Sequence, residues 1–269
     1  MSVPPVSPTS LERQVGRSAF GGDAQAYDDA RSGYPAELFE LLASRSVPRP
    51  RIAEIGAGTG LASQGLFELS PSQLTMIEPD PRLCVFLEHR FTRTDSRVVC
   101  APFPDVDIEG PFDLIACAAA FHWMEPVPAL AKVKSLLAQN GVWAMWWNSY
   151  FGHGEADPFA EQVVRILLEE GVVLPPSYIG SKHYAFEAEY HISMLRDAGF
   201  DRIEHTVFRA PRVFTASQAR ELYQSFSFIR VLPDINQIKI LDRIAAIVEG
   251  EFGGSAPSLY ATSLFVGTA

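Results

Sequence analysis

A glycine-rich turn directly after a short apolar run limits the possible folds of this chain more than any other feature. Residues 51–55 predict a short buried strand, Gly56, Gly58 and Gly60 open a turn, and residues 61–69 predict a helix. Glycine lacks a Cβ and reaches positive φ freely, so the backbone of such a turn passes close to a ligand. The helix N-terminus behind the turn offers N–H groups without intrahelical partners. The pattern therefore predicts a ligand at this strand–helix junction.

Two acidic residues indicate which ligand this is. Glu78 follows the predicted strand 74–77, and an acid about 20 residues past a glycine turn typically accepts hydrogen bonds from ribose hydroxyls. Glu54 lies inside the strand before the turn, where its charge favours an amine-bearing cation and repels a pyrophosphate. Leu61 occupies the place of the third glycine in the dinucleotide fingerprint. We therefore expect a nucleoside ligand other than NAD.

Strands and helices alternate from residue 51 onwards. Strands are expected at 51–56, 73–78, 97–101, 112–118 and 141–147, and helices at 60–69, 81–92 and 126–139. This alternation predicts a parallel sheet with helices on both faces. Two segments, 151–190 and 210–256, interrupt the pattern and are expected as helical insertions. The strands expected at 202–209 and 258–266 suit an antiparallel pair at one edge of the sheet. Residues 1–20 are expected to be a disordered tail in front of one domain, 21–269.

Composition excludes several classes of partner. The net charge of −10 argues against a nucleic-acid substrate, because backbone phosphates require basic patches. No apolar stretch is long enough to span a membrane, and the N-terminus lacks the features of a signal peptide, so we expect a cytoplasmic protein. Cys84, Cys100 and Cys117 show no metal-ligand spacing and are expected to be small apolar core residues. No metal site is predicted, and the sequence leaves the oligomeric state open.

The turn and its two acids resemble the first two motifs of class I S-adenosylmethionine (SAM) methyltransferases. The segments 112–115 and 118–123 are similar to the motif after the fourth strand of the small-molecule methyltransferases grouped as type 11 or type 25. Residues 136–144 and the N-terminal Tyr27, Arg31 and Tyr34–Pro35 are also similar to segments of that group. The resemblance covers roughly residues 20–269, within a few residues at each boundary.

The resemblance implies a fold, a cofactor and a reaction. The fold is a Rossmann-like α/β sheet of seven mostly parallel strands with a reversed last strand, helices on both faces and helical cap insertions. The reaction is in-line transfer of a methyl group from SAM to a small-molecule acceptor, leaving S-adenosylhomocysteine. A SAM-binding protein without methyl transfer, regulatory or lyase-like, is the alternative. Neither the acceptor nor the methylated atom type can be named, because this fold hosts many acceptors.

The expected cofactor residues lie on five segments. Tyr27 and Arg31 are expected as a lid over the SAM carboxylate. Because no acid follows the third strand before Asp105, backbone groups near Ala101 and the Phe103 ring are expected to contact adenine. The full cofactor set is Tyr27, Arg31, Glu54, Gly56, Ala57, Gly58, Gly60, Glu78, Pro79, Ala101, Pro102, Phe103, Ala118 and Phe121.

The acceptor side is less defined. His122 lies past the carboxyl end of the fourth strand, where ligands bind in open α/β sheets, and has three open roles: structural, cofactor contact or general base. We expect one core residue in each of two aromatic pairs, Phe121 with Trp123 and Trp146 with Trp147. The expected acceptor-binding residues are Trp123, Trp147, Asn148, Tyr150 and Tyr223, with His153, Tyr184 and Arg230 as further candidates on the insertions.

Overall fold

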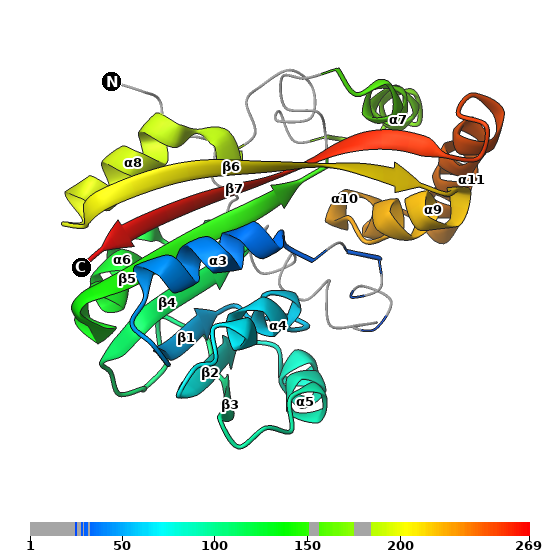
Figure 1. The fold of residues 1–269 in the computed structure, drawn as a ribbon. Coiled ribbons are helices and arrows are strands. Elements are labelled where there is room, and N and C mark those ends of the chain that lie inside the picture. Colours follow the sequence, from blue (N-terminus) through cyan, green and yellow to red (C-terminus); the bar gives the residue numbers. More distant parts are fainter. Residues whose placement is uncertain (1–24, 26–27, 29, 32, 151–155, 175–183) are drawn as a thin grey trace.

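One seven-stranded sheet organises the part of the chain that the computed structural model describes, which comprises residues 25, 28, 30, 31, 33–150, 156–174 and 184–269. The strand order is β3-β2-β1-β4-β5-β7-β6 (Figure 1). Strand β7 runs antiparallel to both neighbours, and the other strands run parallel to one another. The strands are β1 (Arg51–Ile55), β2 (Gln73–Glu78), β3 (Ser96–Cys100), β4 (Phe112–Ala118), β5 (Leu137–Ser149), β6 (Asp201–Phe214) and β7 (Ala256–Thr268). The predicted Rossmann-like sheet with a reversed last strand is confirmed.

The central strands owe their position to apolar runs that are buried on both faces. Nearly every residue of β1, β2 and β4 is buried, as expected for parallel strands covered by helices on each side. The edge strands β3 and β6 are mostly half-buried or exposed. Pro211 lies within β6, which an edge position tolerates because the missing N–H need not serve a second neighbour.

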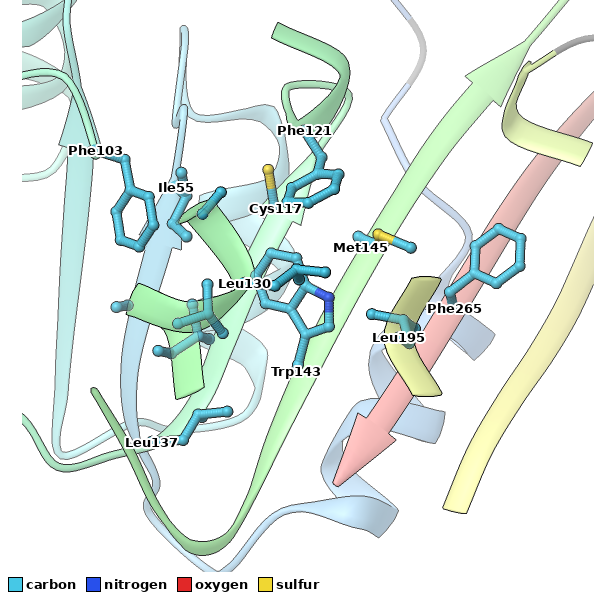
Figure 2. Packing of buried hydrophobic residues seen from close by; sticks show 14 of the residues in the cluster. Ile55, Phe103, Cys117, Phe121, Leu130, Leu137, Trp143, Met145, Leu195 and Phe265 are labelled. Carbon is cyan, nitrogen blue, oxygen red and sulfur yellow. The ribbon is translucent and has the colours of Figure 1, made fainter. Parts of the chain in front are cut away.

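Helices cover both faces of the sheet, as predicted. On one face, α3 (Ala36–Arg45), α4 (Leu61–Glu68) and α5 (Pro81–Arg90) bury apolar side chains such as Leu42, Leu66 and Leu87 against β1, β2 and β4. On the other face, α6 (Pro126–Leu136) and α8 (Ala188–Asp197) pack through Leu130 and Leu195 (Figure 2). Two short 3-10 helices, η1 (Phe121–Trp123) and η3 (Tyr184–Phe186), belong to this second face.

Four further helices form a second hydrophobic cluster, which we call the cap: α7 (Pro158–Glu169), α9 (Ala216–Gln224), α10 (Ser227–Arg230) and α11 (Asp234–Gly250). In Figure 1 they lie beyond the arrowhead of β5 and around the end of β6, at the carboxyl edge of the parallel strands. Tyr150 and Tyr260, from β5's end and β7, continue the sheet into this cluster. Buried Asp157 accepts hydrogen bonds from the N–H of Ala160 at the start of α7 and from the Ser258 hydroxyl and Leu259 N–H of β7.

Several predicted boundaries were wrong. The helix expected to reach residue 139 ends at Leu136, because Leu137 already pairs with Phe112 in the β4–β5 ladder. Strands β6 and β7 extend further than predicted, since they pair from Asp201 to Phe214 and carry the sheet into the cap. Residues 184–190 of the first expected insertion, 151–190, and the residues of α8 that follow them pack on the sheet instead of the cap. The expected tail, 1–20, lies outside the described residues.

Within the described ranges, no helix is both long and apolar enough to cross a bilayer.

Candidate functional site

The glycine turn connects β1 to α4 in a conformation that needs glycine. Gly56, Gly58 and Gly60 all have positive φ, at 70°, 59° and 87°. The N–H groups of Gly56 and Ala57 donate to the carbonyl of Ile77 in β2, at 2.8 and 3.2 Å, which ties the turn to the neighbouring strand. The turn is therefore fixed by backbone hydrogen bonds at the carboxyl edge of the sheet.

The three glycines serve different purposes. A Cβ on Gly56 would lie 2.4 Å from the Cβ of Ala120, and one on Gly60 would lie 2.4 Å from the Phe91 ring. A Cβ on Gly58 would meet no described atom within 4 Å. Close packing therefore requires glycine at positions 56 and 60, whereas the described residues leave space beside Gly58, where the positive φ alone favours glycine.

Glu78, at the end of β2, is bound to this turn. Its Oε2 accepts the N–H of Gly58 at 2.9 Å, and its Oε1 accepts the N–H of Asp80 at 3.0 Å. The side chain is 6% exposed. A carboxylate oxygen can accept more than one hydrogen bond. Glu78, the predicted ribose acceptor, thus lies beside Gly58, the glycine of this turn that has no described atom near its Cβ position, and Pro79 follows at the same edge.

Glu54 is a fully buried carboxyl group beneath the turn. Its Oε2 accepts a hydrogen bond from the Ser63 hydroxyl of α4 at 2.5 Å, and its Oε1 is buried with no hydrogen-bond partner in the described part of the chain. Burial raises the pKa of this carboxyl to about 8, the Ser63 hydrogen bond opposes that shift, and the charge of Glu78 adds to it. A buried acidic oxygen without a partner is costly, and a cationic donor would compensate it.

The N-terminal segment contacts the turn and the cap. The Thr59 hydroxyl donates to Asp28 at 2.8 Å, and the Arg90 guanidinium bridges Asp28 and the Thr59 carbonyl. Arg31 instead reaches the cap, where it donates to the Ser225 carbonyl at 3.4 Å and lies over the Phe226 ring at 4.2 Å. The predicted lid residue Arg31 is thus placed between the sheet and the cap, while Tyr27 lies outside the described residues.

The residues expected around adenine divide into exposed backbone and buried core. Ala101 follows β3, and its N–H donates to the Glu78 carbonyl at 3.1 Å; Pro102 is exposed beside it. Phe103 is 4% exposed and belongs to the hydrophobic cluster between the sheet and helices α6 and α8, which we call the main cluster (Figure 2). The expectation that its ring forms an adenine wall finds no support, because the ring is occupied by core packing.

The carboxyl end of β4 supports the next predicted residues. Ala118 ends the strand, and Ala120 contacts Gly56, so the η1 turn follows directly beside the glycine turn.

Phe121 is 1% exposed and packs edge-on against Trp143, with ring centroids 5.6 Å apart, so it is the core member of the pair Phe121 and Trp123. His122 and Trp123 are half-buried, with ring centroids 4.5 Å apart.

The predicted acceptor residues are brought together only in part. Trp146 and Trp147 point to opposite faces as expected, but both are core residues, at 0% and 3% exposure, because each face is covered by helices. Asn148 accepts a hydrogen bond from the Thr262 hydroxyl at 2.8 Å. Tyr150 and Tyr223 are buried in the cap cluster, and Arg31 lies 5.4 Å from the centre of the Tyr150 ring.

The remaining candidates on the insertions lie in different parts of the fold. Tyr184 packs against Trp147 on the main sheet, with ring centroids 5.3 Å apart, and not in the cap. Arg230 ends α10 in the cap, and His153 lies outside the described residues.

Sequence reasoning missed Ser63, Asp28 and His191, since their roles depend on long-range contacts that no local pattern reveals. Among the described residues no cluster of three or more metal-ligand side chains occurs.

The known proteins to which this chain is similar are described as methyltransferases. A family model described as a methyltransferase domain (Methyltransf_12) matches residues 53–143. An uncharacterized methyltransferase-like protein of Schizosaccharomyces pombe is 26% identical over 246 residues, which cover 88% of this chain and 90% of that protein. A malonyl-[acyl-carrier protein] O-methyltransferase of Geobacter sulfurreducens is 27% identical over 155 residues, covering 54% of this chain and 55% of that protein.

Solved structures show the same fold at low identity. A protein from Anaeromyxobacter dehalogenans, described as a type II methyltransferase, superposes with a TM-score of 0.64 and 18% identity. The match covers 89% of this chain and 97% of that one, so the likeness extends over the cap as well as the sheet.

Proposed function

We propose that this chain, a SAM-dependent methyltransferase of the type 11/12 branch, transfers the methyl group of SAM to a small organic molecule. The observation that supports the cofactor site best is the pairing of Gly58, open on one side, with two buried carboxylates, Glu54 and Glu78. One carboxylate oxygen of Glu54 lacks a hydrogen-bond partner among the described residues, so the site fits a ligand that carries an ammonium group.

Each residue of the site has a defined task in this proposal. Glu78 accepts hydrogen bonds from the ribose hydroxyls while it holds the turn through the Gly58 N–H. Glu54 ionises opposite the ligand ammonium, and Ser63 keeps that carboxyl in place. Gly58 lets the ligand approach the backbone. When bound, SAM supplies an electrophilic methyl group on a positively charged sulfur.

Methyl transfer of this kind needs little catalytic machinery from the protein. Alignment of the acceptor and exclusion of water supply much of the rate acceleration. This explains why the sequence shows a clear cofactor pattern but no acid–base constellation. The cap stands at the carboxyl edge of β5 and is the part of the fold best placed to enclose an acceptor. The net charge of −10 favours a small molecule over a nucleic acid.

Calorimetric titration of the full chain tests the cofactor assignment. We expect SAM and S-adenosylhomocysteine to bind at one site per chain, and NADH not to bind. A Gly58→Val variant should lose this binding, because the valine side chain would enter the ligand side of the turn and is strained at the positive φ of this position. Circular dichroism of the variant checks that the fold is retained. Binding of NADH without binding of SAM would overturn the proposal.

A further inference from the structure

A hydrogen bond fixes the position of the proton on His122. The Nε1–H of Trp147 donates to Nδ1 of His122 at 3.1 Å. A neutral imidazole that accepts at one ring nitrogen carries its proton on the other. The ring is neutral at pH 7, because burial lowers the pKa of His122 to about 4. Its proton therefore lies on Nε2, at the edge of the ring away from Trp147.

Trp147 is itself held on its other side. Its indole stacks on His191 with centroids 5.3 Å apart and 27° between the planes, and it meets the Tyr184 ring edge-on at 5.3 Å. The Nε2 of His191 lies 2.9 Å from the Tyr184 carbonyl, which locks this pair together. The indole is 3% exposed, so it cannot turn without displacing η3 and α8. Its N–H is thus aimed at His122 by the packing of the main sheet.

His122 lies next to the proposed cofactor site. Ala120, two residues before it, contacts Gly56 of the glycine turn, and the N–H of Ala119 donates to the Trp146 carbonyl at 2.8 Å. Among the described residues, the Tyr184 phenol is a titratable group that faces the His122 ring, with ring centroids 6.4 Å apart. Burial raises the pKa of that phenol, so it is neutral and leaves the state of His122 unchanged near pH 7.

We propose that Trp147 is a positioning residue that holds His122 as a hydrogen-bond donor through Nε2–H. This inference rests on the proposed function, because it assigns a role within the same methyl-transfer site. His122 has no free lone pair in this arrangement, since Nδ1 is occupied by the indole and Nε2 carries the proton. It therefore does not act as a general base, and the acceptor is one whose lone pair is available without deprotonation by His122.

Nitrogen-15 NMR of the labelled full chain with S-adenosylhomocysteine tests the tautomer directly. We expect Nδ1 of His122 to be unprotonated and Nε2 to be protonated, with the signals assigned by their loss in a His122→Gln variant. A Trp147→Phe variant keeps an aromatic ring but removes the indole donor. In that variant we expect a mixture of tautomers and a higher His122 pKa. A proton on Nδ1 in the wild-type chain, or an unchanged His122 in Trp147→Phe, would overturn the proposal.

A pair of substitutions distinguishes a donor from a base. The glutamine amide N–H reaches about the place of Nε2–H, so His122→Gln should retain at least about tenfold more methyl transfer into a metabolite extract than His122→Ala. Equal loss in both variants would indicate a base and contradict the proposal. Calorimetry with SAM is done in parallel. A wild-type chain that does not bind SAM refutes the proposed function, whereas the NMR result tests only the tautomer of His122.

Discussion

A Glu54→Gln substitution is expected to stabilise the unliganded protein while it weakens SAM binding. Glu54 is fully buried and shares one hydrogen bond with Ser63, and its second oxygen has no partner in the described chain. Glutamine has the shape of the protonated carboxyl group and still accepts the Ser63 hydrogen bond. The substitution therefore removes the cost of a buried ionisable group without changing the packing around it.

The size of this effect follows from the pKa of the carboxyl. The folded-state pKa of about 8 lies above the ordinary value of 4.5, so the folded chain binds this proton more tightly than the unfolded chain. The corresponding stability is present below pH 4.5 and is lost as the pH rises to about 8. At about 1.4 kcal/mol per pKa unit, the loss is at most roughly 5 kcal/mol. Glutamine does not titrate, so the variant keeps its stability over this range.

Urea unfolding of both proteins at about pH 5 and about pH 8 measures the effect. We expect nearly equal free energies of unfolding at the lower pH and a clearly more stable variant at the higher pH. The affinity for SAM should fall by about 1.5–3 kcal/mol, the usual loss for a hydrogen bond to a charged group. A variant that is less stable than wild type at both pH values would refute the reasoning, since Glu54 would then be a satisfied structural residue.

Three further substitutions test the site and the cap. Glu78→Ala should weaken SAM binding by about 1.5–3 kcal/mol in calorimetry; unchanged affinity would place the ribose elsewhere. Both Gly58→Val and Gly60→Val strain a backbone of positive φ, but Gly60→Val should lower the melting temperature further because its side chain also meets Phe91; the reverse order would contradict the two roles. Asp157→Ala should cost about 1–3 kcal/mol and increase hydrogen exchange in α7; unaltered exchange would show that this carboxylate does not fasten the cap.

The sequence predicted the elements whose signals are local. Apolar runs bounded by turns defined β1, β2 and β4, and the glycine spacing predicted the turn that connects β1 to α4. The reversed β7 and the cap helices followed from the break in strand–helix alternation and from the family resemblance. These features depend on periodicity or spacing within about 30 residues, which a single sequence displays.

The features that the sequence did not reveal depend on tertiary packing. Phe103 and Phe121 were expected at the cofactor, but the main cluster buries both rings. Tyr184 was expected on an insertion, yet it packs against Trp147 because η3 returns to the main sheet. Strands β6 and β7 were predicted too short, since their extension is stabilised by pairing with each other and by the cap, which neither segment shows alone.

Transfer of a deuterated methyl group from SAM into a small-molecule metabolite extract tests the central claim most directly. Mass spectrometry after incubation with the full chain should show one or more low-molecular-weight products that carry the labelled methyl group. The Gly58→Val variant, which should lose the cofactor, is the matched control and should give none of these products. Binding of SAM without any labelled product across extracts would contradict the account and favour a SAM-binding protein without methyl transfer.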